Sequence, residues 1–161
     1  MARRTATLLA ALSLALVGLV PASASASTEV TAYTAQLSGA QEVPPNSSLA
    51  RGSAVLQLNA DGTALEFRLI AANIENVVMA HIHAAPAGTN GPIVAFLLHP
   101  QSDPGRSDGV LATGTITAAN LTGPLAGQSL DALVAALESG GAYVNVHTTQ
   151  LPAGEIRGQI H

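Results

Sequence analysis

The chain of 161 residues contains six arginines, no lysine and ten acidic residues, which gives a formal net charge of −4 at pH 7. A negatively charged surface without lysine lacks the clustered cations with which proteins bind nucleic acid or anionic membranes. The chain has no cysteine, two tyrosines and two phenylalanines. Its stability must therefore come from a core of aliphatic side chains, without disulfides.

The first 26 residues have the features of a signal peptide. A pair of arginines precedes an apolar segment at 8–20, and residues 21–26 contain two overlapping sites with the small residues that signal peptidase requires. The apolar segment is shorter than the roughly 20 residues of a membrane span. The apolar residue that follows the arginines of a twin-arginine signal is missing, so we expect export by general secretion. We expect cleavage after Ala26 or Ala24. Residues 27–161 would then form one secreted domain without a transmembrane segment.

Beyond the signal peptide, short runs alternate apolar and polar residues between Gly, Pro, Asn and Asp, which is typical of antiparallel strands. A turn at 59–63, with Gly62 at positive φ, is expected to join two strands as a hairpin. Residues 93–98 are apolar on both faces, which predicts a central strand buried on both sides. The predicted strands are 33–38, 52–58, 64–71, 78–83, 93–98, 112–118, 142–147 and 155–160.

One segment has the periodicity of a helix. Its apolar residues recur at helical spacing, with Ser129 as the expected N-cap, Asp131 in the first turn and Gly140 at the end. These apolar residues are Leu130, Leu133, Val134 and Leu137. Eight strands and one short helix predict an all-β fold, an antiparallel two-sheet sandwich of immunoglobulin-like or Greek-key type on which the helix lies.

Four motifs, in order along the chain, resemble those of the CHRD domain family, named after repeats in the animal protein chordin and also found singly in bacterial exported proteins. They are LSGAQEVPP at 37–45, AHIH at 80–83 with NGP at 90–92, GAYVNVHT at 141–148 and GEIRGQI at 154–160. The resemblance spans residues 31–160 and implies a secreted β-domain. We expect a non-catalytic extracellular binding or structural module, whose partner is an extracellular protein or a cell-surface ligand.

Polar residues are concentrated in three of the predicted strands. His81 and His83 are two residues apart and therefore lie on one face of a strand. By the same alternation, one face of a later strand carries Tyr143, Asn145 and His147, and one face of the last strand carries Glu155, Arg157, Gln159 and His161. The short connection between these two strands predicts a hairpin, which would place His147 near Glu155 or Arg157.

Two interpretations of the histidines are open. In one, His81, His83 and His147 bind copper or zinc, His99 is a candidate fourth ligand, and Asn145 or Glu155 supports the ligands. Imidazole suits both metals, and three histidines leave an open position for water or substrate. In the other interpretation the histidines bond to loop carbonyls and hold no metal, and Glu155 and Arg157 form a surface ion pair of little energetic value.

The order of the histidines is similar to that on the copper side of Cu/Zn superoxide dismutase, which is also a β-sandwich. On this resemblance Arg157 would correspond to an anion-guiding arginine, and the alternative function is a copper-binding protein or copper oxidoreductase. Neither a Gly-x-Ser-x-Gly nucleophile motif nor a phosphate loop with a lysine occurs in the chain. Glu42 precedes two prolines that stiffen a corner, and we expect it to reach an arginine.

Overall fold

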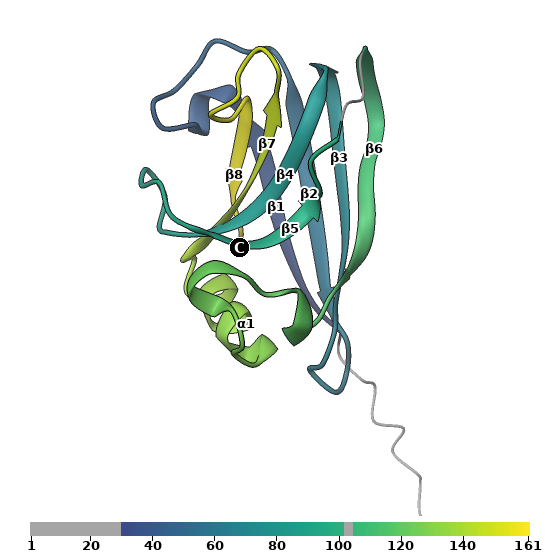
Figure 1. The fold of residues 1–161 in the computed structure, drawn as a ribbon, viewed down its shortest axis with the longest axis vertical. Coiled ribbons are helices and arrows are strands. Elements are labelled where there is room, and N and C mark those ends of the chain that lie inside the picture. The colour runs from purple at the N-terminus through teal and green to yellow at the C-terminus, as the bar shows by residue number, and fades with distance from the viewer. Residues whose placement is uncertain (1–29, 102–104) are drawn as a thin grey trace, which may run out of the picture.

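The computed structural model describes residues 30–101 and 105–161, so the predicted signal peptide lies outside the described residues. Its eight strands form one antiparallel sheet in the order β5-β4-β7-β8-β1-β2-β3-β6. The sheet curls until β5 and β6, its two end strands, approach each other, which gives a nearly closed barrel (Figure 1). The strands are β1 (Thr31–Ser38), β2 (Arg51–Leu58), β3 (Leu65–Glu75), β4 (Val77–Ala84), β5 (Ile93–Leu98), β6 (Arg106–Ile116), β7 (Ala142–Thr148) and β8 (Ile156–Gln159).

The all-β antiparallel class is confirmed, and every predicted strand corresponds to an observed one. The division into two immunoglobulin-like sheets is not confirmed, because pairing continues across all eight strands. β1 and β8 are joined through Ser38 and Arg157 and by reciprocal backbone hydrogen bonds between Thr34 and His161. The 59–63 hairpin turn is confirmed, with Gly62 at φ +73°.

The prediction of a central position for residues 93–98 is wrong, since β5 lies at one end of the strand order. Its apolar character on both sides has a different cause. Val94 and Leu97 join the core, while the ring of Phe96 lies against that of His81, 4.7 Å between centroids. A strand at the end of a sheet can therefore be covered on both faces.

Aliphatic side chains fill the inside of the barrel, including Leu37, Leu56, Leu69, Ile82, Val144 and Ile156. Helix α1 (Leu130–Glu138) lies near one end of the strands and buries Leu130, Leu133 and Leu137 (Figure 1). The helix stops where Gly140 adopts φ +65°. Ser129 is at the N-cap position as expected, but its side chain forms no capping hydrogen bond, and its hydroxyl donates to Asp131 Oδ2 at 3.2 Å. Three short 3₁₀ turns complete the structure: η1 (Gly39–Gln41), η2 (Ala118–Asn120) and η3 (Gly123–Leu125).

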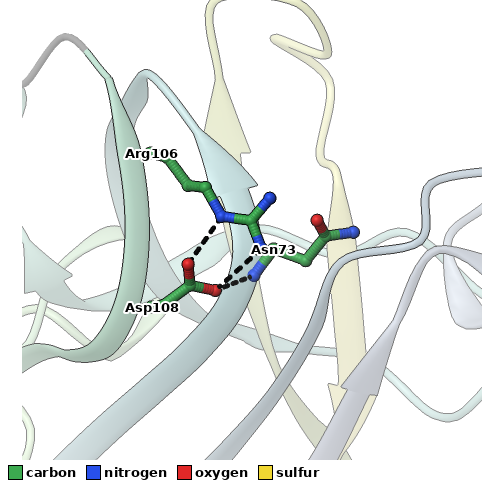
Figure 2. A network of polar contacts seen from close by, with 3 residues as sticks. All are labelled: Asn73, Arg106 and Asp108. Atoms are coloured by element: carbon green, nitrogen blue, oxygen red, sulfur yellow. Dashed lines mark hydrogen bonds and ion pairs between the residues drawn. The ribbon is translucent and has the colours of Figure 1, made fainter.

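A bulge interrupts the pairing of β3 with β6 between Ala71 and Ile74. There Asn73 has φ +57°, and its backbone N–H donates to Asp108 Oδ1 at 2.6 Å (Figure 2). Arg106 Nε donates to the other oxygen of the same carboxylate at 2.6 Å. This ion pair is half exposed and adds little stability by itself. The Asp108 carboxylate nevertheless holds the backbone of the bulge in place. Bulges of this kind bend and twist a strand near the edge of a sheet.

β7 and β8 are buried on both faces. Their inward residues pack in the barrel, and their outward side is covered by the connections 39–50, 85–92 and 149–155. Asn46 Nδ2 donates to the Glu155 carbonyl at 3.0 Å, which joins the 39–50 and 149–155 connections. Arg157 of β8 donates to the Thr89 carbonyl at 2.8 Å, which ties the 85–92 connection to the sheet. We call the outward side of β4, β7 and β8, together with these connections, the covered face.

β8 can approach β1 closely only because it has no side chain at Gly158. A Cβ there would lie 2.4 Å from the Gln36 carbonyl oxygen, which belongs to the backbone and cannot easily move. We expect Gly158→Ala to lower the free energy of unfolding by about 2–3 kcal/mol, measured by urea denaturation. Gly141→Ala is the control, because the nearest atom to its Cβ is the Ser139 hydroxyl at 3.2 Å. Equal losses in the two variants would contradict the close approach.

Candidate functional site

Three histidines meet on the covered face. His81 and His83 come from β4, His147 comes from β7, and one ring nitrogen of each lies within 4.8 Å of the others. His81 Nδ1 lies 3.1 Å from His147 Nε2. The antiparallel register brings them together, because it pairs His81 with Asn145 and Met79 with His147. The three side chains are 1%, 9% and 8% exposed, so the cluster is shielded from water.

Backbone carbonyls determine which nitrogen is protonated in two of the rings. His83 Nδ1 donates to the Gly91 carbonyl at 2.8 Å, and His147 Nδ1 donates to the Pro152 carbonyl at 3.0 Å. A carbonyl only accepts, so Nδ1 carries the proton and Nε2 is unprotonated in each neutral ring. His147 Nε2 can then accept a hydrogen bond from His81 Nδ1, 3.1 Å away. The Nε2 atoms of His81 and His83 are buried and have no hydrogen-bond partner among the described residues. Metal-binding histidines are commonly held in this way by their second nitrogen.

Burial lowers the pKa of all three histidines, because the charged imidazolium loses its hydration. The pKa of His81 falls to about 4, and repulsion from His147 and His83 adds to the effect of burial. The rings are therefore neutral at pH 7. Neutral imidazole is the form that binds a metal ion.

Neighbouring rings hold the cluster in place. The Tyr143 ring stacks on His83, with centroids 4.8 Å apart and an interplanar angle of 6°. The Arg157 guanidinium lies 3.4 Å from the centroid of the Tyr143 ring. Phe96 packs edge-on against His81, and the Asn145 amide lies 3.0 Å from His147 Nε2. The site is thus a packed assembly in which a ring can turn only slightly.

The structure brings together His81, His83, His147 and Asn145, but not the candidate fourth ligand. His99 is exposed and stacks on Phe96, with centroids 4.9 Å apart, outside the three-histidine cluster. A metal held at about 2.0–2.1 Å from each nitrogen requires the ligand atoms to be less than about 4.2 Å apart. The three histidines therefore fit a metal ion after a small inward adjustment of their rings.

Glu155 and Arg157 belong to the predicted hairpin of β7 and β8, which is confirmed, with Asn145 opposite Arg157. Their interpretation as a surface ion pair is wrong, because both are buried and bond to different partners. Glu155 accepts hydrogen bonds from Ser48 and Thr148, each at 2.7 Å. Arg157 donates to the Asn90 side chain and to carbonyls of the 85–92 connection. The two residues hold the loops of the covered face in place.

Glu42 is a functional candidate whose environment the sequence does not reveal. It is 6% exposed, and its Oε1 has no hydrogen-bond partner among the described residues. Arg157 is near enough to favour its charge, but the two side chains form no ion pair, so the expected contact with an arginine is electrostatic only. Burial raises the pKa of Glu42 to about 7. Glu42 follows a short 3₁₀ turn, where no periodic pattern signals burial.

The all-β fold and its covered polar face define the class of protein, a small antiparallel β-domain. The family model of the CHRD domain matches residues 33–160, and the chain belongs to this family. No curated protein and no solved structure matches the chain significantly. Among the described residues, no helix is both long and apolar enough to cross a membrane.

We expect the raised pKa of Glu42 to make stability depend on pH. Between about pH 4.5 and 7 the folded carboxyl keeps a proton that the unfolded chain loses, so the free energy of unfolding falls as pH rises through this range. Glu42→Gln removes the ionisation. The difference in free energy of unfolding between this variant and the unmodified protein should rise by about 2 kcal/mol in favour of the variant from pH 5 to pH 8, measured by urea denaturation.

Glu66→Gln is the control for this experiment. Glu66 is an exposed carboxylate on β3, so its variant should follow the unmodified protein at both pH values. A constant difference between Glu42→Gln and the unmodified protein at pH 5 and pH 8 would contradict the raised pKa.

Proposed function

We propose that this CHRD domain is an exported, non-catalytic module whose histidine cluster binds zinc or copper. The observation that carries the proposal is the hydrogen bonding of the rings. His83 and His147 use Nδ1 for a loop carbonyl, which leaves each Nε2 as an electron-pair donor within the cluster. Three neutral imidazoles are a ligand set suited to both metals.

The position of the cluster supports a stabilising role for the ion. His81 and His83 belong to β4 and His147 to β7, and two of the rings are tied to the 85–92 and 149–155 connections. An ion bound by all three would link two strands and, through the rings, two loops. In an exported domain without cysteine, such a link would take the place of a disulfide as a restraint.

The shielding of the cluster favours a non-catalytic module over a copper oxidoreductase. His81 is 1% exposed, and Phe96 packs on its ring. A redox enzyme needs its substrate to reach the metal, and a closed site does not provide that access. Export rests on residues 1–26, which lie outside the described residues, and on the family. An extracellular protein or a cell-surface ligand is the partner that this location suggests.

Protein prepared without a histidine tag should bind one equivalent of Zn(II) or Cu(II), and its Tm should rise with metal concentration because the ion binds only the folded state. A free concentration a hundred times Kd would add about 2.7 kcal/mol of stability. His83→Ala should lose the metal-induced rise in Tm. The measurements are thermal unfolding and calorimetric titration, with each variant compared with its own metal-free form.

His99→Ala is the matched control, because His99 directly follows β5 and lies outside the cluster. It should keep the full rise in Tm. No rise in the unmodified protein at micromolar metal would refute the proposal, and an equal rise in His83→Ala would exclude this site.

A further inference from the structure

A second polar centre lies on the covered face, in a cavity of about 420 Å³ between the 39–50 connection, the 85–92 connection and β8. Its volume is within the range of small-ligand sites. Asn90 Nδ2 donates to the Val43 carbonyl at 2.8 Å and thereby joins the two connections. The walls include the apolar side chains of Val43, Pro45 and Ala87. The polar side chains that line the cavity are those of Gln41, Glu42, Arg157 and Gln159.

The Glu42 carboxyl is held in this cavity by close packing on Gly154. A Cβ at position 154 would lie 2.6 Å from Glu42 Oε1 and 2.9 Å from Oε2. Gly154 also has φ +133°, which other residues rarely adopt. The chain is therefore shaped to accommodate the carboxyl group of Glu42, a residue that is 6% exposed and whose Oε1 has no hydrogen-bond partner among the described residues.

Arg157 does not serve as the counter-ion of Glu42. Its two terminal nitrogens donate to Asn90 Oδ1 and to the carbonyls of Pro86 and Thr89, and its plane lies over Tyr143. Within the described residues the only ion pair is that of Arg106 and Asp108. A buried carboxylate without an ion pair is unfavourable unless it is protonated or a cation is supplied from outside.

A second buried acceptor without a partner belongs to Gln159, a residue that lines the cavity. Gln159 Nε2 donates to the carbonyls of Ala85, Gly140 and Ala142, and the buried Oε1 of the same amide has no partner among the described residues. Two acceptors without donors, one of them a carboxyl, suit a ligand that carries positive charge and several N–H groups. The apolar walls suit an alkyl chain attached to it.

We propose that this cavity binds a primary alkylammonium group, with Glu42 as its counter-ion and the alkyl stem between Val43, Pro45 and Ala87. The group can belong to a free alkylamine or to the lysine side chain of an extracellular peptide. The chain itself contains no lysine, so it cannot occupy the site with a side chain of its own. This site is separate from the histidine cluster, and the proposal does not depend on metal binding.

Ammonium binding should displace the proton of Glu42. Burial raises the pKa of Glu42 to about 7, and the nearby charge of Arg157 opposes this rise. Arg157 of β8 is the charged group that faces Glu42. The 85–92 connection contains no titratable side chain. Glu155 bonds to Ser48 and Thr148 instead of to Glu42. Between pH 8 and pH 6 the ionised fraction of such a carboxyl falls about tenfold, and the affinity for an ammonium should fall equally.

The test uses n-butylammonium and the blocked lysine N-acetyl-lysine-N-methylamide, titrated calorimetrically into residues 27–161 in the presence of EDTA. We expect saturable binding of one equivalent of n-butylammonium at pH 8 and about tenfold weaker binding at pH 6. Binding of the blocked lysine as well would identify a peptide lysine as a source, and binding of butylammonium alone would identify a free amine. Either result supports the site.

Glu42→Gln should abolish this binding while it preserves the size of the side chain, and Glu66→Gln, an exposed carboxylate on β3, should leave it unchanged. Neutral 1-butanol has the same alkyl chain and should not bind. The proposal is overturned if neither ammonium compound binds the unmodified protein at millimolar concentration, if Glu42→Gln binds as well, or if butanol matches butylammonium. The Tm of each variant confirms that it is folded.

Discussion

All seven residues of β7 are buried, although only every second one points into the barrel. Its polar side chains, on the outward side, are therefore removed from water and must find partners within the protein. An unpaired buried polar group costs about 1–3 kcal/mol. The 85–92 and 149–155 connections meet this requirement, because the Gly91 N–H donates to the Tyr143 hydroxyl and the Pro152 carbonyl accepts from His147. The loops that cover β7 thus belong to the structure of the site.

Because most buried polar side chains find partners, the few buried polar atoms without a partner are informative. Four buried side-chain atoms of the described residues have no hydrogen-bond partner: Glu42 Oε1, His81 Nε2, His83 Nε2 and Gln159 Oε1. All four are at the covered face, and none is in the apolar core. Unsatisfied polar groups that gather in one place are expected at binding sites more than at positions that only stabilise the fold. Two of these atoms are histidine nitrogens and two are side-chain oxygens of Glu42 and Gln159, which suggests two ligands of different chemistry.

Strand periodicity predicted much of the site. Alternation in β4 and β7 placed His81 with His83, and Asn145 with His147, on common faces, and the short connection to β8 predicted the hairpin. The failures involve contacts across long sequence separations. Glu155 bonds to Ser48, and Arg157 bonds to Thr89, instead of to each other, because two separate loops cover the strand. No local pattern reports what covers the outer face of a sheet.

By itself the sequence determined the class of fold, the family and the faces on which the histidines lie, because these depend on alternation and motif order within short segments. The tertiary structure decided which strands are neighbours, that β5 is at one end of the sheet, and that His99 is outside the cluster. It also placed Glu42 at the wall of a cavity, with its carboxyl group packed on Gly154. These features depend on the register and curvature of the whole sheet and on loop packing, which no single segment encodes.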